Sequence, residues 1–414
     1  MNEAKQKFCL TSLERAWILY DVGNSAFVLL VATLIPIFFN ALAEGGGLSS
    51  VEYLAYWGYA ASAVTVITAV LSPILGTLAD TRNFKKPIFT FCVAVGVIGC
   101  CAMGMASTWL PFLLIFIFAK VGFSGSLVFY DSMLSDVTVP DRMDEVSSKG
   151  YAWGYIGSCV PFVVCLALVL GSGAIGMSQM TALTIALFIT AAWWLVTTLP
   201  LLRRYRQVNY VEVEQHAIRQ SFVRIGHTLK HLYEDKQVFW FLLAFFCYID
   251  GVYTIIDMAT AYGTALGLDT TGLLLALLVT QIVAFPSALV FGRLSGQYPS
   301  GTLIPVCIAA YAGIALFAFF LKHQWQFWVL AVVVGMFQGG IQALSRSHFA
   351  KIIPPEKSGE YFGLFDICGK GASFLGTMIV SVGSQLTGSA NVGVGSLIVL
   401  FIVGFVLFRV SDQK

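Results

Sequence analysis

Long apolar segments, separated by short polar loops, are the feature of this sequence that most restricts its fold. Twelve segments are long enough to cross a lipid bilayer as helices, since a crossing takes about 20 mostly apolar residues. Charged residues make up only 11% of the chain, whereas a soluble globular protein has about a quarter. We therefore predict an all-α integral membrane protein with twelve transmembrane helices. The predicted segments are residues 16–40, 54–79, 88–106, 111–136, 148–171, 179–201, 238–262, 270–292, 302–321, 326–350, 359–386 and 392–410.

The longest polar stretch divides the chain into two parts of similar size. It predicts an N-terminal six-helix bundle (1–202), a central linker (203–236) and a C-terminal six-helix bundle (237–414). Most Lys and Arg residues of the loops lie on the side of both termini, so the positive-inside rule places the termini and the linker in the cytoplasm. Within the linker, residues 211–232 are expected to form amphipathic helices along the membrane surface.

The first segment contains a carboxylate and an amide. Asp21 and Asn24 are three residues apart, so on a helix they project from nearly the same face. Such groups are costly to expose to lipid, and we expect them to face the interior of the bundle and to take part in function. The alternative is that Asp21 lies at the level of the lipid headgroups or caps a neighbouring helix.

Further polar side chains occur inside the other segments, where charged groups usually pair or face a water-filled cavity. Asp21, Asp131 and Asp250 are the best candidates for binding and releasing a proton, because burial favours the neutral form of a carboxyl group. Asp257 lies near the outer end of its segment and is a candidate gating group. The other candidates for substrate binding are Tyr130, Gln342, Arg346, Asp366 and Lys370.

Roles other than substrate contact are open for three of these residues. Asp366 and Lys370 are four residues apart, so they can form a salt bridge within one helix that lowers the cost of burying both charges. For this pair a structural role competes with substrate contact. Arg346 lies within a turn or two of the cytoplasmic end of its segment, so it either extends its charge to the membrane surface or serves an inner gate.

A short loop after the second segment has the most specific local pattern. It runs from Gly76 through Asp80 to Arg82, Lys85 and Lys86. The glycine allows two helices to approach closely, and the acid can bind a helix N-terminus or a basic partner. The pattern resembles the signature loop of the major facilitator superfamily, which implies a gating latch between the two halves in the outward-open state. The alternative is an ordinary positively charged cytoplasmic loop.

The two halves show traces of an internal repeat. Residues 125–140 align without gaps with residues 339–354, and Asp21 and Asp250 each follow a tyrosine in the first and seventh segments. Two six-helix halves related by an axis along the membrane normal are a transporter architecture. Lys120 lies where the superfamily often has a basic residue in its fourth helix.

Several stretches resemble one branch of this superfamily. They are residues 20–26, 148–157 and 338–347, followed by Pro354, Glu360, residues 362–364 and Lys370. They resemble the "unknown major facilitator" family, which includes the autophagy-related vacuolar amino-acid effluxers of fungi. Residues 22–23 and 129–132 depart from the family pattern, and the second departure falls in a helix that commonly lines the cavity. The substrate is therefore the property that the resemblance transfers least well.

Other classes of protein fit the sequence less well. None of the five histidines lies at mid-membrane in the predicted segments, which argues against a membrane-embedded enzyme. The nine cysteines show no CxxC spacing, so we expect neither a metal site nor a cofactor. The sequence has no phosphate-binding loop for ATP, and its dispersed basic residues do not indicate a nucleic-acid partner. A non-transporting membrane sensor is a further alternative.

These observations predict a secondary transporter that works by alternating access to a central site. The resemblance implies a small amino acid or related metabolite as substrate, and the buried acids make the proton a candidate coupling ion. A lipid, a lysophospholipid or an amphipathic drug is the alternative substrate. We expect the protein to act as a monomer in the lipid bilayer, in the inner (plasma) membrane of a bacterium.

Overall fold

The computed structural model of the chain describes residues 9–212, 230 and 233–412. Eleven spans among these residues have the length and hydropathy of a membrane-crossing helix. A helix suits this environment because every backbone group in lipid must find its partner within the protein. A further helix of 30 residues, α14 (Ser358–Thr387), occupies the position of the eleventh predicted segment. The all-helical membrane fold is confirmed, and the number of twelve crossings stays a prediction.

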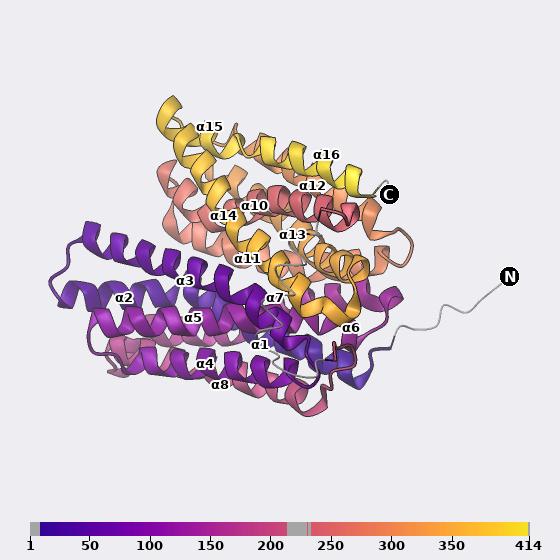
Figure 1. Cartoon of the computed structure of the whole chain (residues 1–414). Helices are drawn as coiled ribbons and strands as arrows, with labels where there is room; N and C mark the ends of the chain where they lie inside the picture. The colour runs from indigo at the N-terminus through magenta and orange to yellow at the C-terminus, as the bar shows by residue number, and fades with distance from the viewer. Residues whose placement is uncertain (1–8, 213–229, 231–232, 413–414) are drawn as a thin grey trace.

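The helices form two groups, one on each side of the linker in the sequence (Figure 1). The end of the molecule near both chain termini is called the terminal end below. The first group is α1 (Ser12–Ala32), α2 (Leu34–Gly45), α3 (Ser50–Ala79), α4 (Lys85–Met105), α5 (Trp109–Ser132), α6 (Leu134–Val137), α7 (Pro140–Leu170), the 3-10 helix η1 (Ser172–Ile175) and α8 (Gln179–Arg204). The second group is α10 (Lys236–Ala265), α11 (Thr270–Leu294), α12 (Ser300–Ala318), α13 (Gln324–Ile352), η2 (Pro355–Lys357), α14, α15 (Ala390–Gly395) and α16 (Ile398–Asp412).

The first predicted segment is interrupted, which corrects the expectation of one continuous helix. The Thr33 hydroxyl donates to the carbonyl of Leu29 at 2.6 Å and separates α1 from α2. A hydroxyl bound to the carbonyl four residues earlier bends a helix, and Pro36 in the following turn has no N–H to offer. The last predicted segment is likewise divided into α15 and α16.

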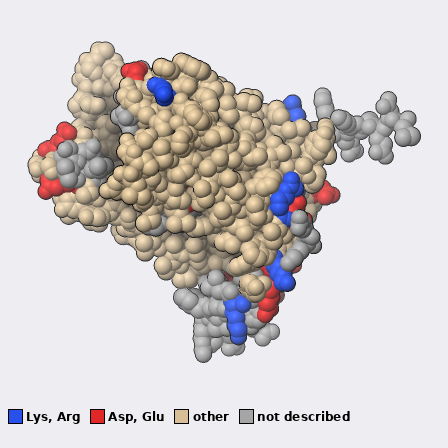
Figure 2. All heavy atoms as spheres, turned by 90° about the horizontal axis from the view of Figure 1, so that it is seen from above, with Lys and Arg blue, Asp and Glu red and all other residues tan. Residues whose placement is uncertain are grey.

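The surface of the helices suits a lipid environment. Figure 2 shows a broad face almost free of charged side chains, with most of the charged residues near the edge at the terminal end. Large apolar side chains lie on the outside of the helices, as in α4, where Phe91 is 69% exposed, and in α5, where Phe118 is 67% exposed. A water-soluble monomer rarely exposes so much apolar surface.

Close packing in the first group depends on a glycine beneath a tryptophan. The Trp194 ring is fully buried and its centroid lies 5.5 Å from that of Phe27 and 5.7 Å from that of Phe123. A Cβ atom added at Gly96 would overlap the far edge of this indole and lie 3.4 Å from the Phe123 nitrogen. The position therefore brings α4 against both α5 and α8.

The halves are joined at the terminal end by a carboxylate that caps a helix of the other half. Asp80, directly after α3, accepts hydrogen bonds from the backbone nitrogens of Gly359 at 2.7 Å and Glu360 at 2.8 Å, in the first turn of α14. A negative charge at a helix N-terminus is stabilised by the helix dipole. Gly76 and Gly359 are so close that a Cβ atom on either would overlap the other residue's carbonyl oxygen. The sequence pattern thus marks a real contact between the halves.

Lys85 lies fully buried at the centre of this contact. Its ammonium group is 3.7 Å from Asp80 and 3.6 Å from Asp136, and it donates to the Ser358 hydroxyl at 2.8 Å. Burial raises the pKa of the Asp80 carboxyl group to about 7, while Lys85 and the two amides of α14 act in the opposite direction. Ionised Asp80 is therefore costly to bury and depends on these three donors.

The start of the linker is fixed to the first half. Asp136 accepts from the Tyr205 hydroxyl at 2.5 Å and from Asn209, through its backbone nitrogen at 2.8 Å and its side-chain amide at 2.9 Å. The Val211 nitrogen donates to the carbonyl of Asp80 at 2.8 Å. The predicted amphipathic helices of residues 211–232 fall almost entirely outside the described residues.

The two remaining basic residues of the loop lie at its surface. Arg82 pairs with Glu212 at 3.0 Å, and the two side chains are 57% and 65% exposed. Lys86 is partly buried in the first turn of α4. Their predicted gating role, like that of Gly76, Asp80 and Lys85, stays a prediction.

We expect Gly96→Ala to destabilise the protein by about 1–3 kcal/mol, because overpacking forces a buried side chain to move. The midpoint of thermal unfolding in detergent measures this. Gly58→Ala is the control, because Gly58 is an exposed position of α3 where an added Cβ atom meets nothing within 4 Å. Equal unfolding midpoints for the two variants would contradict the packing argument.

We expect Asp80→Asn to shift the protein away from the conformation in which the terminal end is closed. The amide NH2 cannot accept from α14, so one backbone N–H is left unpaired at a cost of about 1–3 kcal/mol. A cysteine introduced at Ala343, which is fully buried next to α7, should then react several-fold faster with a maleimide. Arg82→Gln is the control and should leave the rate within about twofold, because exposed ion pairs contribute little. Slower labelling of Asp80→Asn than of the parent would contradict the latch.

Candidate functional site

A cavity of about 650 Å³ lies between the two halves. Its walls come from α1, α3, α5 and α7 of the first half and from α10, α11, α13 and α14 of the second. A volume in this range is typical of a site for one small molecule. The polar side chains that line it are Asp21, Asn24, Ser25, Thr65, Lys120, Ser124, Asp131, Tyr151, Tyr155, Ser158, Tyr253, Asp257, Gln281, Gln338, Gln342, Arg346 and Asp366.

Arg346 of α13 reaches from the second half into the first. Its Nη1 is 3.0 Å from Asp131 Oδ1 and 3.4 Å from Asp21 Oδ2, and its Nη2 is also 3.4 Å from Asp21 Oδ2. Its Nε donates to the Ser147 hydroxyl at 2.9 Å, and Nη2 donates to the Ser147 carbonyl at 3.1 Å. These four residues are called the Arg346 cluster below. They bring together α1, α5, α7 and α13.

Aromatic rings enclose the same guanidinium. Its central carbon lies 4.6 Å from the ring centroid of Trp17 and 4.3 Å from that of Tyr151, within the range of cation–π attraction. The Arg346 side chain is only 2% exposed, which contradicts the alternative that it extends to the membrane surface. Its donors and faces are already occupied by the protein, so a substrate anion can reach it only by displacing one of these partners.

Neighbouring residues hold the two acids of the cluster in place. The Asn24 amide donates to the carbonyl of Tyr20 at 3.0 Å and to Asp21 at 3.3 Å, which fixes the carboxylate orientation. A Cβ atom at Gly150 would lie 2.7 Å from Asp21 Oδ2 and 3.1 Å from Arg346 Nη2. Only a residue without a side chain fits beside this ion pair. Asp21 is 6% exposed and pairs with Arg346 of the other half, so its side chain is directed into the interface between the halves.

The predicted polar residues of α5, α13 and α14 have different positions. Gln342 lines the cavity and accepts from the Tyr155 hydroxyl at 2.8 Å. Tyr130 does not line it; its ring stacks on Trp17 with centroids 4.4 Å apart. Asp366 lines the cavity and accepts from the Ser72 hydroxyl of α3 at 2.8 Å, so it also links the halves. The side chain of Lys370 lies outside the described residues, and the predicted Asp366–Lys370 pair stays a prediction.

The two predicted acids of α10 lie in different surroundings. Asp257 lines the cavity from the second half, and Lys120 lines it from the first. The Lys120 ammonium nitrogen lies 4.7 Å from the ring centroid of Phe123. Asp250 is fully buried within the second half and accepts from the Gly376 nitrogen at 2.8 Å. Asp250 is therefore directed between α10 and α14 and does not line the cavity with Asp21 and Asp131, and its predicted role in proton binding stays a prediction.

A second ion pair between the halves lies nearer the terminal end. Asp144 of α7 accepts from the Lys351 ammonium at 2.5 Å and from the Ser347 hydroxyl at 2.6 Å, both on α13. Sequence reasoning missed this pair, and it missed Trp17, Ser147 and Tyr151 around Arg346. Trp17 precedes Asp21 by four residues and Tyr151 follows Ser147 by four, so helical spacing alone could have placed each pair on one face.

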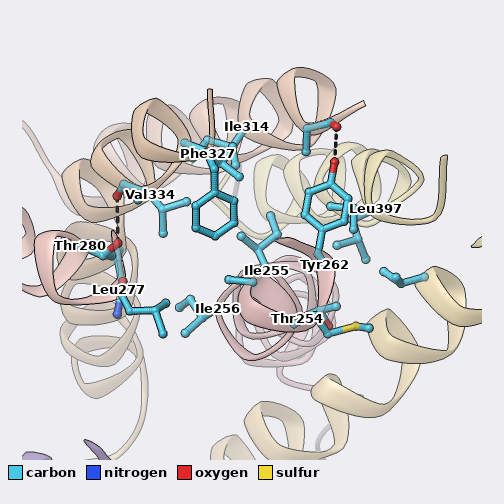
Figure 3. Close-up of a pocket in the computed structure, with 18 of the residues that line it drawn as sticks. Thr254, Ile255, Ile256, Tyr262, Leu277, Thr280, Ile314, Phe327, Val334 and Leu397 are labelled. Atoms are coloured by element: carbon cyan, nitrogen blue, oxygen red, sulfur yellow. Dashed lines mark hydrogen bonds between the residues drawn. The ribbon is translucent and has the colours of Figure 1, made fainter. Parts of the chain in front are cut away.

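A smaller apolar pocket of about 60 Å³ adjoins the cavity inside the second half (Figure 3). It shares Ile256, Gln281 and Gln338 with the main cavity. Two hydroxyl groups of its wall donate to backbone carbonyls, Thr280 to Ala331 at 3.2 Å and Tyr262 to Ala318 at 2.6 Å, and the Thr254 hydroxyl donates to Asp250 at 3.3 Å. The pocket therefore presents an apolar lining, while the Oε1 atom of Gln338 is buried without a hydrogen-bond partner.

Comparison with solved structures shows the fold. The structure is similar to the transporter FucP of the major facilitator superfamily in its outward conformation, with a TM-score of 0.72 and 16% identity over 97% of this chain and 98% of that chain. It is also similar to the human organic anion transporter MFSD10, with a TM-score of 0.71 and 14% identity over 96% of this chain and 98% of that one.

Comparison with known sequences shows the family. The chain is 42% identical to an uncharacterised MFS-type transporter, YxiO of Bacillus subtilis, over 98% of this chain and 96% of that protein. It is 26% identical to autophagy-related protein 22 of Coccidioides immitis over 65% of this chain and 51% of that protein. The family model described as "Vacuole effluxer Atg22 like" matches residues 12–414. The chain therefore belongs to the Atg22-like vacuole effluxer family, a family of transporters with the major facilitator fold.

Proposed function

We propose that this protein is a secondary transporter that moves a small amino acid or related metabolite by alternating access, with the proton as coupling ion. The observation that carries the proposal is the polar cavity between two helix groups, which has the Arg346 cluster in its wall and is closed toward the terminal end by the Asp80 contact. Rocking of the two groups about such a cavity would expose it to one side of the membrane at a time.

The distribution of charge supports an orientation for this cycle. Basic loop residues gather on the side of both termini, so the terminal end would face the cytoplasm. The structure would then be an outward-facing state, closed on the cytoplasmic side. We expect the protein to act as a monomer in the inner (plasma) membrane of a bacterium, and one relative of the chain comes from the bacterium Bacillus subtilis.

The charges of the cavity suit a zwitterion. Asp366 of α14 supplies negative charge, and Lys120 of α5 supplies positive charge from a different wall. An amino acid carries both an ammonium and a carboxylate group, so each of its ends can meet an opposite charge. Two ionic contacts to one substrate in a partly desolvated site would give selectivity, because charge-assisted hydrogen bonds are stronger than neutral ones.

One observation favours a second candidate substrate class. The apolar pocket beside Ile256, Gln281 and Gln338 could hold an apolar tail while a polar head remains in the main cavity. A lysophospholipid or an amphipathic drug has this form.

The experiment that tests the function is uptake into proteoliposomes. A panel of labelled amino acids and one labelled lysophospholipid should be offered with and without an imposed proton gradient. Gradient-dependent accumulation of an amino acid is the expected result. Accumulation of the lysophospholipid alone would transfer the proposal to the second substrate class, and accumulation of neither would overturn it.

Asp21→Asn should lower the gradient-driven transport rate by about tenfold or more, because loss of a charge-assisted hydrogen bond costs about 1.5–3 kcal/mol. Folding should be little affected, since the amide is isosteric with the carboxylate. Lys149→Gln is the control, because its pair with Glu145 is within α7 and partly exposed. A normal rate for Asp21→Asn at every pH tested would show that this residue is not part of the site.

A further inference from the structure

The Arg346 cluster is a mechanical connection between the halves. Arg346 is carried by the second half, and among the described residues the hydrogen-bond and ring partners of its guanidinium belong to the first half. Opening of the terminal end must therefore withdraw a guanidinium that is 2% exposed from three helices. Withdrawal leaves the two acids without their counter-charge, which is costly at membrane depth.

The cluster holds one negative charge more than its cation can balance. Asp21 and Asp131 share the single guanidinium of Arg346, and both carboxylates contact the same nitrogen, Nη1. One bound proton makes the cluster electrically neutral. Two carboxylates on one site are the arrangement in which one of them readily holds a proton.

Asp131 is the better placed of the two acids to receive this proton. Its side chain is 21% exposed and lines the cavity, whereas that of Asp21 is 8% exposed. Asp21 is also held by the Asn24 amide. Six titratable or charged groups face Asp131: Asp21 of α1, Tyr130 of α5, Tyr151 of α7, Tyr253 of α10, Arg346 of α13 and Asp366 of α14.

We propose that Arg346 holds the two halves together at the terminal end and that a proton bound by Asp131 releases it. The proton comes from water in the cavity, binds a carboxylate oxygen and converts the ion pair with Arg346 into a weaker hydrogen bond between the cation and a neutral carboxyl group. The guanidinium then leaves with α13, and the proton returns to water on the other side. This inference rests on the proposed function and names the residue pair that couples the proton to the gate.

The sign of the effect follows from linkage. In the closed state the guanidinium favours ionised Asp131, so a proton binds better after Arg346 has withdrawn. Acid therefore favours the open terminal end, by at most about tenfold in the open-to-closed ratio per pH unit for one proton. An anionic group of a substrate would compete with Asp131 for the same guanidinium and would act in the same direction.

The test is the distance between the halves as a function of pH, measured without substrate. Spin labels on cysteines introduced at Asp141 of α7 and Glu356 of η2, both exposed, report opening by double electron–electron resonance in a chain whose native cysteines are replaced. The parent should gain a longer distance between pH 8 and pH 5. Asp131→Asn imitates the protonated acid, so the longer distance should be present at both pH values.

Asp144→Asn is the matched control, because it weakens another carboxylate–cation pair between α7 and α13. It should shift the distances but keep their dependence on pH. The proposal is overturned if the parent distances do not change with pH, or if Asp131→Asn responds to pH as the parent does. Loss of the pH response in Asp144→Asn as well would equally overturn the assignment to Asp131.

Transport measurements separate this inference from the proposed function. With a substrate in hand, Asp131→Asn should exchange labelled for unlabelled substrate but lose at least tenfold of its gradient-driven accumulation. Exchange together with normal accumulation would overturn the proposed role of Asp131 and Arg346 in coupling, and the proposed transport function would still stand. If no panel member is transported, the distance measurement still tests by itself whether a proton on Asp131 releases Arg346.

Discussion

A guanidinium buried among membrane helices needs opposite charge and hydrogen-bond acceptors within reach, and Arg346 finds both only across the interface between the halves. This requirement makes the closed terminal end a specific state rather than a loose contact. It also explains the surroundings of the residue: the rings of Trp17 and Tyr151 lie against the cation, Ser147 accepts from Nε and Nη2, and Gly150 leaves room beside the ion pair.

Two kinds of interaction close the same end of the molecule. Asp80 uses the backbone amides of the first turn of α14, which needs close approach and therefore Gly76 and Gly359 at the crossing. Arg346 uses side-chain charges deeper in the interface. The first depends on the fit of two backbones and the second on protonation and ligand charge, so the same movement can be stabilised by packing and regulated by electrostatics.

The fold was largely predictable from the sequence because lipid imposes helices of a known length on apolar segments. Asp21, Asp131 and Arg346 could be identified one by one as costly charges, but their meeting depends on how two halves pack, which no local pattern records. The repeat does not place Asp250 in the cavity with Asp21. The tyrosines of the repeat do behave alike, since Tyr20 and Tyr248 each bond a buried serine at 2.6 Å, yet Asp250 turns to a backbone nitrogen of α14.

The attachment of the linker has a consequence for how the chain can be divided. Residues 205–211 bind Asp136 and the loop after α3, so they belong structurally to the first half although they follow its last membrane helix. A chain cut after residue 212 would keep the support of the latch on the N-terminal fragment. A cut after residue 204 would give that support to the other fragment, and the two reassembled proteins should differ in how easily they open.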